Sequence, residues 1–220
     1  MYNASENYKE VYGCANVKLW EVITDTKAAY ETAEEGFEYP GLMNLKRNIS
    51  TNTENRYADD KLQKVITTEG AETLEFEFMG MSKKMEAYIF NDYYNEETGH
   101  YVKLTGTKSR QFAVQFDTGN ADDSDRIYVN YYKVQFERPS TDIKGKTESY
   151  SASSITLKGT VQDTNYKVSM KADDGTTVKT PLKQDSVDGA KTTKDLSTIW
   201  YEEVRLPADV DAMLAATDAE

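Results

Sequence analysis

Residues 71–80 read AETLEFEFMG, and they alternate apolar and polar side chains more regularly than any other stretch of this chain. Successive side chains of a β-strand point to opposite faces, so the alternation predicts a strand with one buried and one exposed face. The apolar face carries Leu74, Phe76 and Phe78. The polar face carries Thr73, Glu75 and Glu77. We therefore expect a sheet that covers a hydrophobic core on one side.

Other stretches alternate in the same way and predict further strands at residues 42–50, 110–119, 126–139 and 153–162. Their polar faces include Lys46, Asn48, Thr156, Lys158 and Thr160. The stretch 126–139 is longer than a typical strand of ~5–6 residues. Its alternation slips at Tyr131 and Tyr132, which predicts a bulge or bend there. The pattern as a whole predicts a mainly β protein.

Residues 48–60, NISTNTENRYADD, contain few side chains that a core could bury. Only Ile49, Tyr57 and Ala58 are plainly apolar, and the better-alternating residues 61–70, KLQKVITTEG, follow directly. Ordering a segment costs conformational entropy, and burial of apolar side chains offsets that cost. So polar a segment offers a compact monomer little apolar surface to bury. Taken by themselves, residues 48–60 predict a poor strand that runs into a loop.

One central helix is predicted at residues 82–93, where Ser82 is a suitable N-cap and Met85, Tyr88 and Ile89 have helical spacing. Residues 1–16 are polar and predict an N-terminal arm before a main domain at residues 17–175. Residues 176–220 are expected to form a C-terminal extension. Within it, residues 199–206, IWYEEVRL, predict a short last strand, and residues 208–216 predict a short helix after Pro207.

The composition is acidic, with 26 Lys and Arg against 38 Asp and Glu and a net charge of −12. Tight binding to a nucleic acid backbone needs clustered cations, so this balance argues against it. The 16 Tyr residues suit half-buried sheet faces and subunit contacts. A single cysteine, Cys14, excludes an intramolecular disulfide framework and fits folding in a reducing cytoplasm. We find no stretch of roughly 20 apolar residues and expect no membrane span.

Residues suited to catalysis or metal binding are sparse. His100 is the only histidine, and neither it nor Cys14 has a catalytic partner nearby in sequence. The acidic runs at residues 120–125 and 171–175 do not match a calcium-binding loop. Glu75 and Glu77 lie two residues apart on one strand face, which suits an exposed sheet better than a glycosidase cleft. We expect no enzymatic activity, no metal and no cofactor.

Residues 52–78, the helix after them and residues 110–162 resemble, in that order, the major tail proteins of long-tailed siphophages of Gram-positive bacteria. The resemblance implies a β-sandwich or barrel-forming fold with one flanking helix, a long protruding hairpin at residues 48–70 and terminal arms. It implies six-membered rings that stack into a tail tube, through which genomic DNA passes without specific binding. Further partners would be the tape measure protein, the distal tail protein and the tail terminator. The protein would be assembled in the host cytoplasm and reside in the virion.

Two sets of residues take on roles through this resemblance. The candidates for lining the lumen are Lys46, Asn48, Thr73, Glu75, Glu77, Thr156, Lys158 and Thr160. The hairpin candidates for contacts with neighbouring subunits are Thr53, Glu54, Asn55, Arg56, Tyr57, Asp59, Asp60, Lys61 and Lys64. A negatively charged lumen wall would repel DNA phosphates, although Lys46 and Lys158 favour a mixed lining.

Three alternatives remain open. A carbohydrate- or receptor-binding β-sandwich of a phage tail could use Tyr93, Tyr94 and Tyr101 in a concave aromatic patch. A hydrolase could use Glu75 and Glu77. A tube protein of a phage-derived particle, such as a bacteriocin, would share the same fold.

Overall fold

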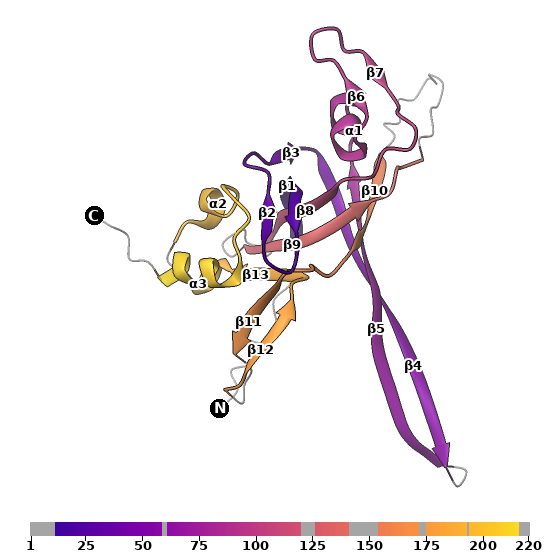
Figure 1. The fold of residues 1–220 in the computed structure, drawn as a ribbon, viewed down its shortest axis with the longest axis vertical. Coiled ribbons are helices and arrows are strands. Elements are labelled where there is room, and N and C mark those ends of the chain that lie inside the picture. The colour runs from indigo at the N-terminus through magenta and orange to yellow at the C-terminus, as the bar shows by residue number, and fades with distance from the viewer. Residues whose placement is uncertain are drawn as a thin grey trace.

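The computed structural model describes residues 12–58, 61–119, 126–140, 154–171, 175–192 and 194–215. Most of the described chain belongs to one antiparallel sheet whose main path is β2-β1-β8-β9-β10-β5-β4 (Figure 1). These strands are β1 (Tyr12–Asp25), β2 (Tyr30–Thr32), β4 (Leu42–Ala58), β5 (Lys61–Phe78), β8 (Gln111–Gly119), β9 (Ile127–Phe136) and β10 (Ile155–Val161). The short strands β3 (Phe37–Tyr39) and β13 (Gln184–Asp188) join it at β1 and β9. The prediction of a mainly β protein is confirmed.

The sheet curves around its own core. Phe76 on β5 packs edge-on against Phe116 on β8 and Phe136 on β9, with ring centroids 6.2 and 6.1 Å apart. β5 is not a hydrogen-bonded neighbour of β8, so this contact requires the sheet to bend across β9 and β10. At its other end β4 returns beside β1. The apolar face predicted for residues 71–80 is fully buried in this core.

Strand β9 is the point where the sheet branches. One edge of β9 pairs with β8, while the other pairs with β13 over its first half and with β10 over its last residues. The register with β8 shifts between the pairs Val114–Tyr131 and Phe112–Val134, which gives β9 one extra residue. The bulge predicted at Tyr131 and Tyr132 is confirmed, and it lies where the strand changes partner.

Helix α1 (Lys83–Phe90) packs its buried side chains onto one end of the core. The Ser82 hydroxyl accepts a hydrogen bond from the backbone N–H of Met85, as expected of an N-cap. The helix ends before the predicted residue 93 because Asn91 adopts a left-handed conformation with φ of 56°. A small two-stranded sheet, β6 (Tyr93–Tyr94) and β7 (Tyr101–Val102), follows it.

The termini differ from the predicted boundaries. β1 begins at Tyr12, so residues 12–16 belong to the sheet and not to an arm, and residues 1–11 lie outside the described part. β13 pairs with β9, so residues 184–188 extend the main sheet beyond the predicted boundary at residue 175. The hairpin of β11 (Lys167–Lys171) and β12 (Thr177–Pro181) precedes it.

The predicted last strand at residues 199–206 is wrong. The chain forms helix α2 (Leu196–Ile199), an irregular segment and helix α3 (Pro207–Ala215), after the short 3-10 helix η2 (Gly189–Lys191). The Asp195 side chain caps α2 by accepting from the N–H of Ser197. Trp200 and Val210 then pack with Tyr128 of β9 in a second small core. Burial of these apolar side chains favours the helices over an edge strand.

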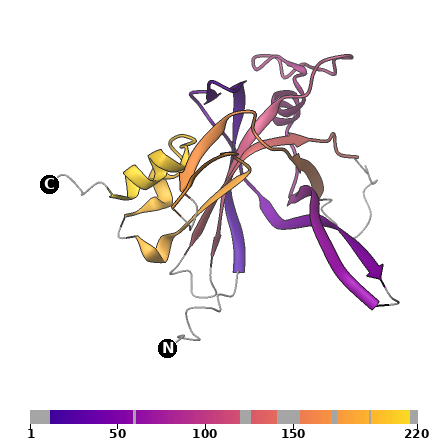
Figure 2. The same cartoon turned by 60° about the horizontal axis from the view of Figure 1, so that its bottom comes forward.

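The hairpin of β4 and β5 extends well beyond the body in both views (Figures 1 and 2). Its strands pair from Leu42 and Phe78 at the body to Ala58 and Lys61 at the far end.

Within the described residues, no helix is long and apolar enough to cross a membrane.

Candidate assembly surfaces

The eight residues predicted to line a lumen come together on one face of three adjacent strands. Glu75 on β5 lies between Lys46 on β4 and Lys158 on β10. Thr73 lies in the same way between Asn48 and Thr160. The third row places Glu77 between Asn44 and Thr156, which adds Asn44 to the predicted set. All of these side chains are exposed or half-buried and point away from the core.

This polar face carries no net charge. Its two glutamates are matched by its two lysines, and Glu75 has a lysine opposite on each neighbouring strand. Opposite charges on directly paired residues stabilise a sheet by roughly 0.2–1 kcal/mol per pair. Equal numbers of acids and bases on this face fit the mixed lining that Lys46 and Lys158 favour. Their position at a lumen stays a prediction.

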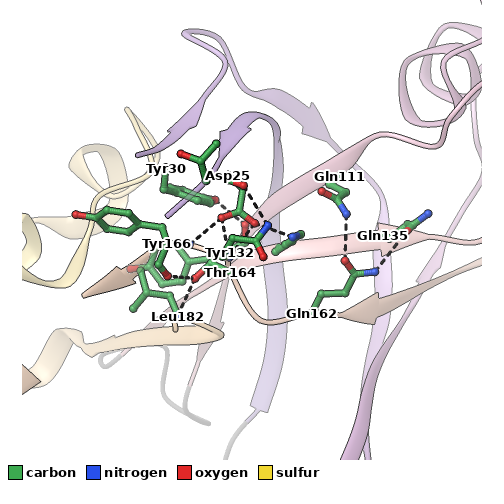
Figure 3. Close-up of polar contacts among 12 residues, drawn as sticks. Asp25, Tyr30, Gln111, Tyr132, Gln135, Gln162, Thr164, Tyr166 and Leu182 are labelled. Carbon is green, nitrogen blue, oxygen red and sulfur yellow. Dashed lines mark hydrogen bonds and ion pairs between the residues drawn. The ribbon is translucent and has the colours of Figure 1, made fainter. Parts of the chain in front are cut away.

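One row of the polar face continues across five strands. Thr160 pairs with Gln135 on β9, and Gln135 pairs with Gln111 on β8. The side-chain amide of Gln162 links the two glutamines: it donates to Gln135 at 3.0 Å and accepts from Gln111 at 3.0 Å (Figure 3). The row from Asn48 to Gln111 is thus neutral throughout. Gln111 and Gln135 are absent from the predicted lumen residues, because only the strand register shows that they extend this row.

The distal half of the hairpin is exposed on both faces. The predicted contact residues Thr53, Glu54, Asn55, Arg56, Tyr57, Lys61 and Lys64 are all exposed. Asp59 and Asp60 lie outside the described residues. From Thr51 to Ala58 the strand β4 runs about 24 Å at about 3.4 Å per residue. Isolated two-stranded hairpins are at best marginally stable in water.

Apolar side chains gather on one face of this distal hairpin. Tyr57 is paired with Leu62, and Asn55 with Val65, so these four share a face. A shift of register between Arg56 and Tyr57 brings Leu62 and Val65 together, although residues three apart in a regular strand point to opposite sides. Tyr57, Leu62 and Val65 are 68%, 50% and 51% exposed. Leu62 and Val65 were absent from the predicted contact set because the bulge could not be located from sequence.

A buried charge cluster holds the hairpin where it leaves the core. Glu72 is 2% exposed and accepts hydrogen bonds from the Arg47 guanidinium and, at 3.0 Å, from the Tyr131 hydroxyl. The Lys183 Nζ lies 3.4 Å from its other oxygen. Burial alone would raise the pKa of Glu72, but these three donors outweigh burial and hold its pKa below the ordinary value. The base of the hairpin is therefore rigidly anchored.

A second buried ion pair joins segments far apart in the chain. The Lys133 Nζ lies 2.6 Å from Asp25 Oδ2, and both side chains are less than a tenth exposed. Asp25 also accepts hydrogen bonds from the backbone N–H groups of Asn165 and Tyr166 (Figure 3). This cluster ties the end of β1 to β9 and to the start of the β11–β12 hairpin. No local sequence pattern indicates this cluster, because the three segments that form it lie more than 25 residues apart.

The three tyrosines of the carbohydrate-binding alternative do not form one patch. Tyr93 pairs with Val102, whereas Tyr94 pairs with Tyr101 on the opposite face of the small sheet. The Tyr101 hydroxyl donates to Asp92 at 2.7 Å, and Arg138 binds the same carboxylate at 2.7 Å. Burial and the Asp92 hydrogen bond raise the pKa of Tyr101 to about 12. Tyr101 therefore fastens α1 to β7 instead of presenting a free ring.

The features of an enzyme are also lacking among the described residues. No group of three or more His, Cys, Asp or Glu side chains there could hold a metal ion. Glu77 accepts a hydrogen bond from the Ser154 hydroxyl at 2.6 Å, and Glu75 is flanked by lysines. Burial raises the pKa of the Cys14 thiol, which disfavours the reactive thiolate.

A curved sheet with one polar face and a long exposed hairpin define a β-sheet protein with surfaces suited to assembly. The comparisons agree: a family model for phage tail tube proteins matches residues 30–190. The chain belongs to this family, is a structural component of the phage tail and hence of the virion, and is not an enzyme. No curated protein matches the chain.

Proposed function

We propose that this protein assembles into six-membered rings that stack into the non-contractile tail tube of a siphophage of a Gram-positive host. The tube is the conduit through which the genomic DNA leaves. Membership in the tail tube family and the resemblance of residues 52–78 and 110–162 to siphophage major tail proteins support this proposal. The tape measure protein, the distal tail protein and the tail terminator are its proposed partners in the virion.

The observation that carries the proposal is the distal β4–β5 hairpin. Two strands that extend about 24 Å with both faces in solvent cannot gain stability from their own core. Exposed Tyr57, Leu62 and Val65 on one side supply an apolar surface of the kind that subunit contacts bury. The partner that fits a structural tail subunit is another copy of the same chain.

The polar face of β4, β5 and β10 is the proposed wall of the lumen. A wall that retained DNA would need cations free to displace counterions from the phosphates. Here Lys46 and Lys158 both lie opposite Glu75, and the row from Asn48 to Gln111 is neutral. Balanced charge and neutral polar side chains favour passage of the duplex without specific binding.

Electron microscopy of the purified full-length chain tests the proposal, with hollow tubes as the expected result. A matched variant replaces residues 53–67 by Asn-Gly, which joins the paired residues Asn52 and Thr68 through a tight turn. It should remain folded by circular dichroism but form no tubes. A second variant with Tyr57→Ser, Leu62→Thr and Val65→Thr keeps the hairpin and should also fail to polymerise. Normal tubes from the shortened chain would contradict the proposal.

A further inference from the structure

Residues 196–215, which we call the strap, lie beside the main sheet in both views (Figures 1 and 2). The strap comprises helix α2, the segment after it and helix α3. Within the described part of the chain, no backbone–backbone hydrogen bond joins the strap to the rest of the fold. The match to the family model ends at residue 190, before the strap begins. The strap is therefore an added element and not a member of the sheet.

Apolar packing holds the strap in a small core of its own. Leu196, Trp200 and Val210 of the strap pack with Tyr128 of β9 and Val187 of β13. This cluster is separate from the main core of the sheet. Loss of the small cluster would therefore leave the main core intact.

Three side chains outside the strap bind its main chain. Lys18, Gln115 and Tyr132 donate hydrogen bonds of 2.9–3.1 Å to backbone carbonyl groups of residues 200–205. Lys18 lies on β1, Gln115 on β8 and Tyr132 on β9. These bonds position the strap over three strands, and breaking them removes none of the backbone hydrogen bonds of the sheet.

Two buried polar groups at this contact have no hydrogen-bond partner. They are the side-chain oxygen of Asn130 on β9 and the indole N–H of Trp200, and these side chains are only 2% and 3% exposed. Both residues line one small cavity beneath the strap, which has no room for a water molecule. Burying a polar group without a partner costs free energy, whereas a hydrated group avoids this cost. Lifting the strap would let water reach both groups.

We propose that the strap opens as a unit while the sheet stays folded, and that the two unpartnered groups favour this opening. The closed state gains the small apolar cluster but keeps Asn130 and Trp200 without partners, and the open state hydrates both. Segments with few ties to the main core open at a lower free energy than the core strands. Opening uncovers the Tyr128 ring and the three donors that bind the strap. The strap thus controls access to this face of the sheet.

Hydrogen exchange of the dilute, unassembled full-length chain tests the opening. The amides of Trp200 and Val210 are hydrogen-bonded within the strap and should exchange at least tenfold faster than the buried amides of β9, to an order of magnitude. Low concentrations of urea should accelerate the β9 amides more than the strap amides, because opening of the strap exposes less surface than global unfolding does. Strap amides with the same rate and urea dependence as the β9 amides would overturn the proposal.

Two substitutions at the strap contact should change the opening in opposite directions. Asn130→Leu removes the unpartnered oxygen and should slow exchange of the strap amides about fivefold. The hydrogen bond between Asn130 and Tyr132 lies within β9, so it is lost equally from the open and the closed state. Lys18→Met removes the bond to the Tyr201 carbonyl and should speed exchange about tenfold. The control Lys179→Met changes an exposed side chain on β12 and should leave the rate unchanged.

Two results from these variants would contradict the proposal. Faster exchange in Asn130→Leu would show that the unpartnered groups do not favour opening. Equal rates in all three variants would show that the two helices fray without release of the strap. Tube formation by the same variants is checked separately by electron microscopy, so either result leaves the proposed function untouched.

Discussion

The Lys133 ammonium group lies 2.6 Å from the Asp25 carboxylate, and this ion pair joins residues that are 108 positions apart in the chain. It is buried, and backbone N–H groups of the segment leading to β11 complete the coordination of the carboxylate. The pair therefore fixes where the C-terminal quarter of the chain attaches to the sheet. The contribution of this ion pair to the free energy of unfolding can be measured on the dilute chain, separately from assembly.

Removing one partner of this pair should destabilise the fold strongly. Lys133→Ala leaves Asp25 buried without its cation, which typically costs about 3–5 kcal/mol. The free energy of unfolding from urea titration of the dilute chain measures the effect. The double variant Asp25→Asn with Lys133→Met should cost less than Lys133→Ala alone, because no uncompensated charge stays buried. A double variant at least as unstable as Lys133→Ala would contradict this account.

The anchor of the hairpin should make stability depend on acid pH. The folded-state pKa of Glu72 lies below its ordinary value of 4.5, so its contribution is fully present above that value. Stability should fall as the pH drops below about 4.5 and Glu72 takes up a proton. Urea titrations at a series of pH values measure this slope. Glu72→Gln should flatten it, whereas Glu69→Gln, at an exposed position on the same strand, should not.

Gly159 should tolerate no side chain. A Cβ there would lie 2.5 Å from Val134 Cγ1 and 2.9 Å from Phe136 Cε1, both in the core. Gly159→Ala should therefore cost about 1–3 kcal/mol through overpacking. The control is Gly80→Ala, since a Cβ at Gly80 has no heavy atom within 4 Å. Adding Val134→Ala should recover part of the loss in a double-mutant cycle, and strict additivity would contradict this account.

The position of the polar face can be tested by thiol labelling of tubes. In a Cys14→Ser background, Thr160→Cys should react with a small maleimide in assembled tubes but not with a maleimide attached to a large polymer. Both reagents should react in unassembled protein. Ile23→Cys, at a position that is 61% exposed and away from the polar face, is the comparison. Equal reaction of Thr160→Cys with both reagents in tubes would show that this face does not line a narrow lumen.

Strong local patterns allowed much of the fold to be predicted from sequence. The alternation in residues 71–80 predicted which side chains enter the core, because period 2 is a property of the strand itself. The slip at Tyr131 and Tyr132 correctly predicted the bulge. The segment at residues 199–206 was misread as a strand because its few apolar residues fit a strand and a turn of helix equally well. Packing of Trp200 and Val210 against Tyr128 resolved that ambiguity.

Local sequence patterns were enough to predict the strand faces, the helix start at Ser82 and the lack of core residues in 48–60, since these depend on neighbours a few residues apart. Tertiary contacts set which strands are adjacent, and so they place Lys46, Glu75 and Lys158 in one row of the polar face. Tertiary contacts alone bring Lys133 to Asp25. Strand register and long-range burial depend on the curvature of the whole sheet. A short stretch of sequence does not determine that curvature.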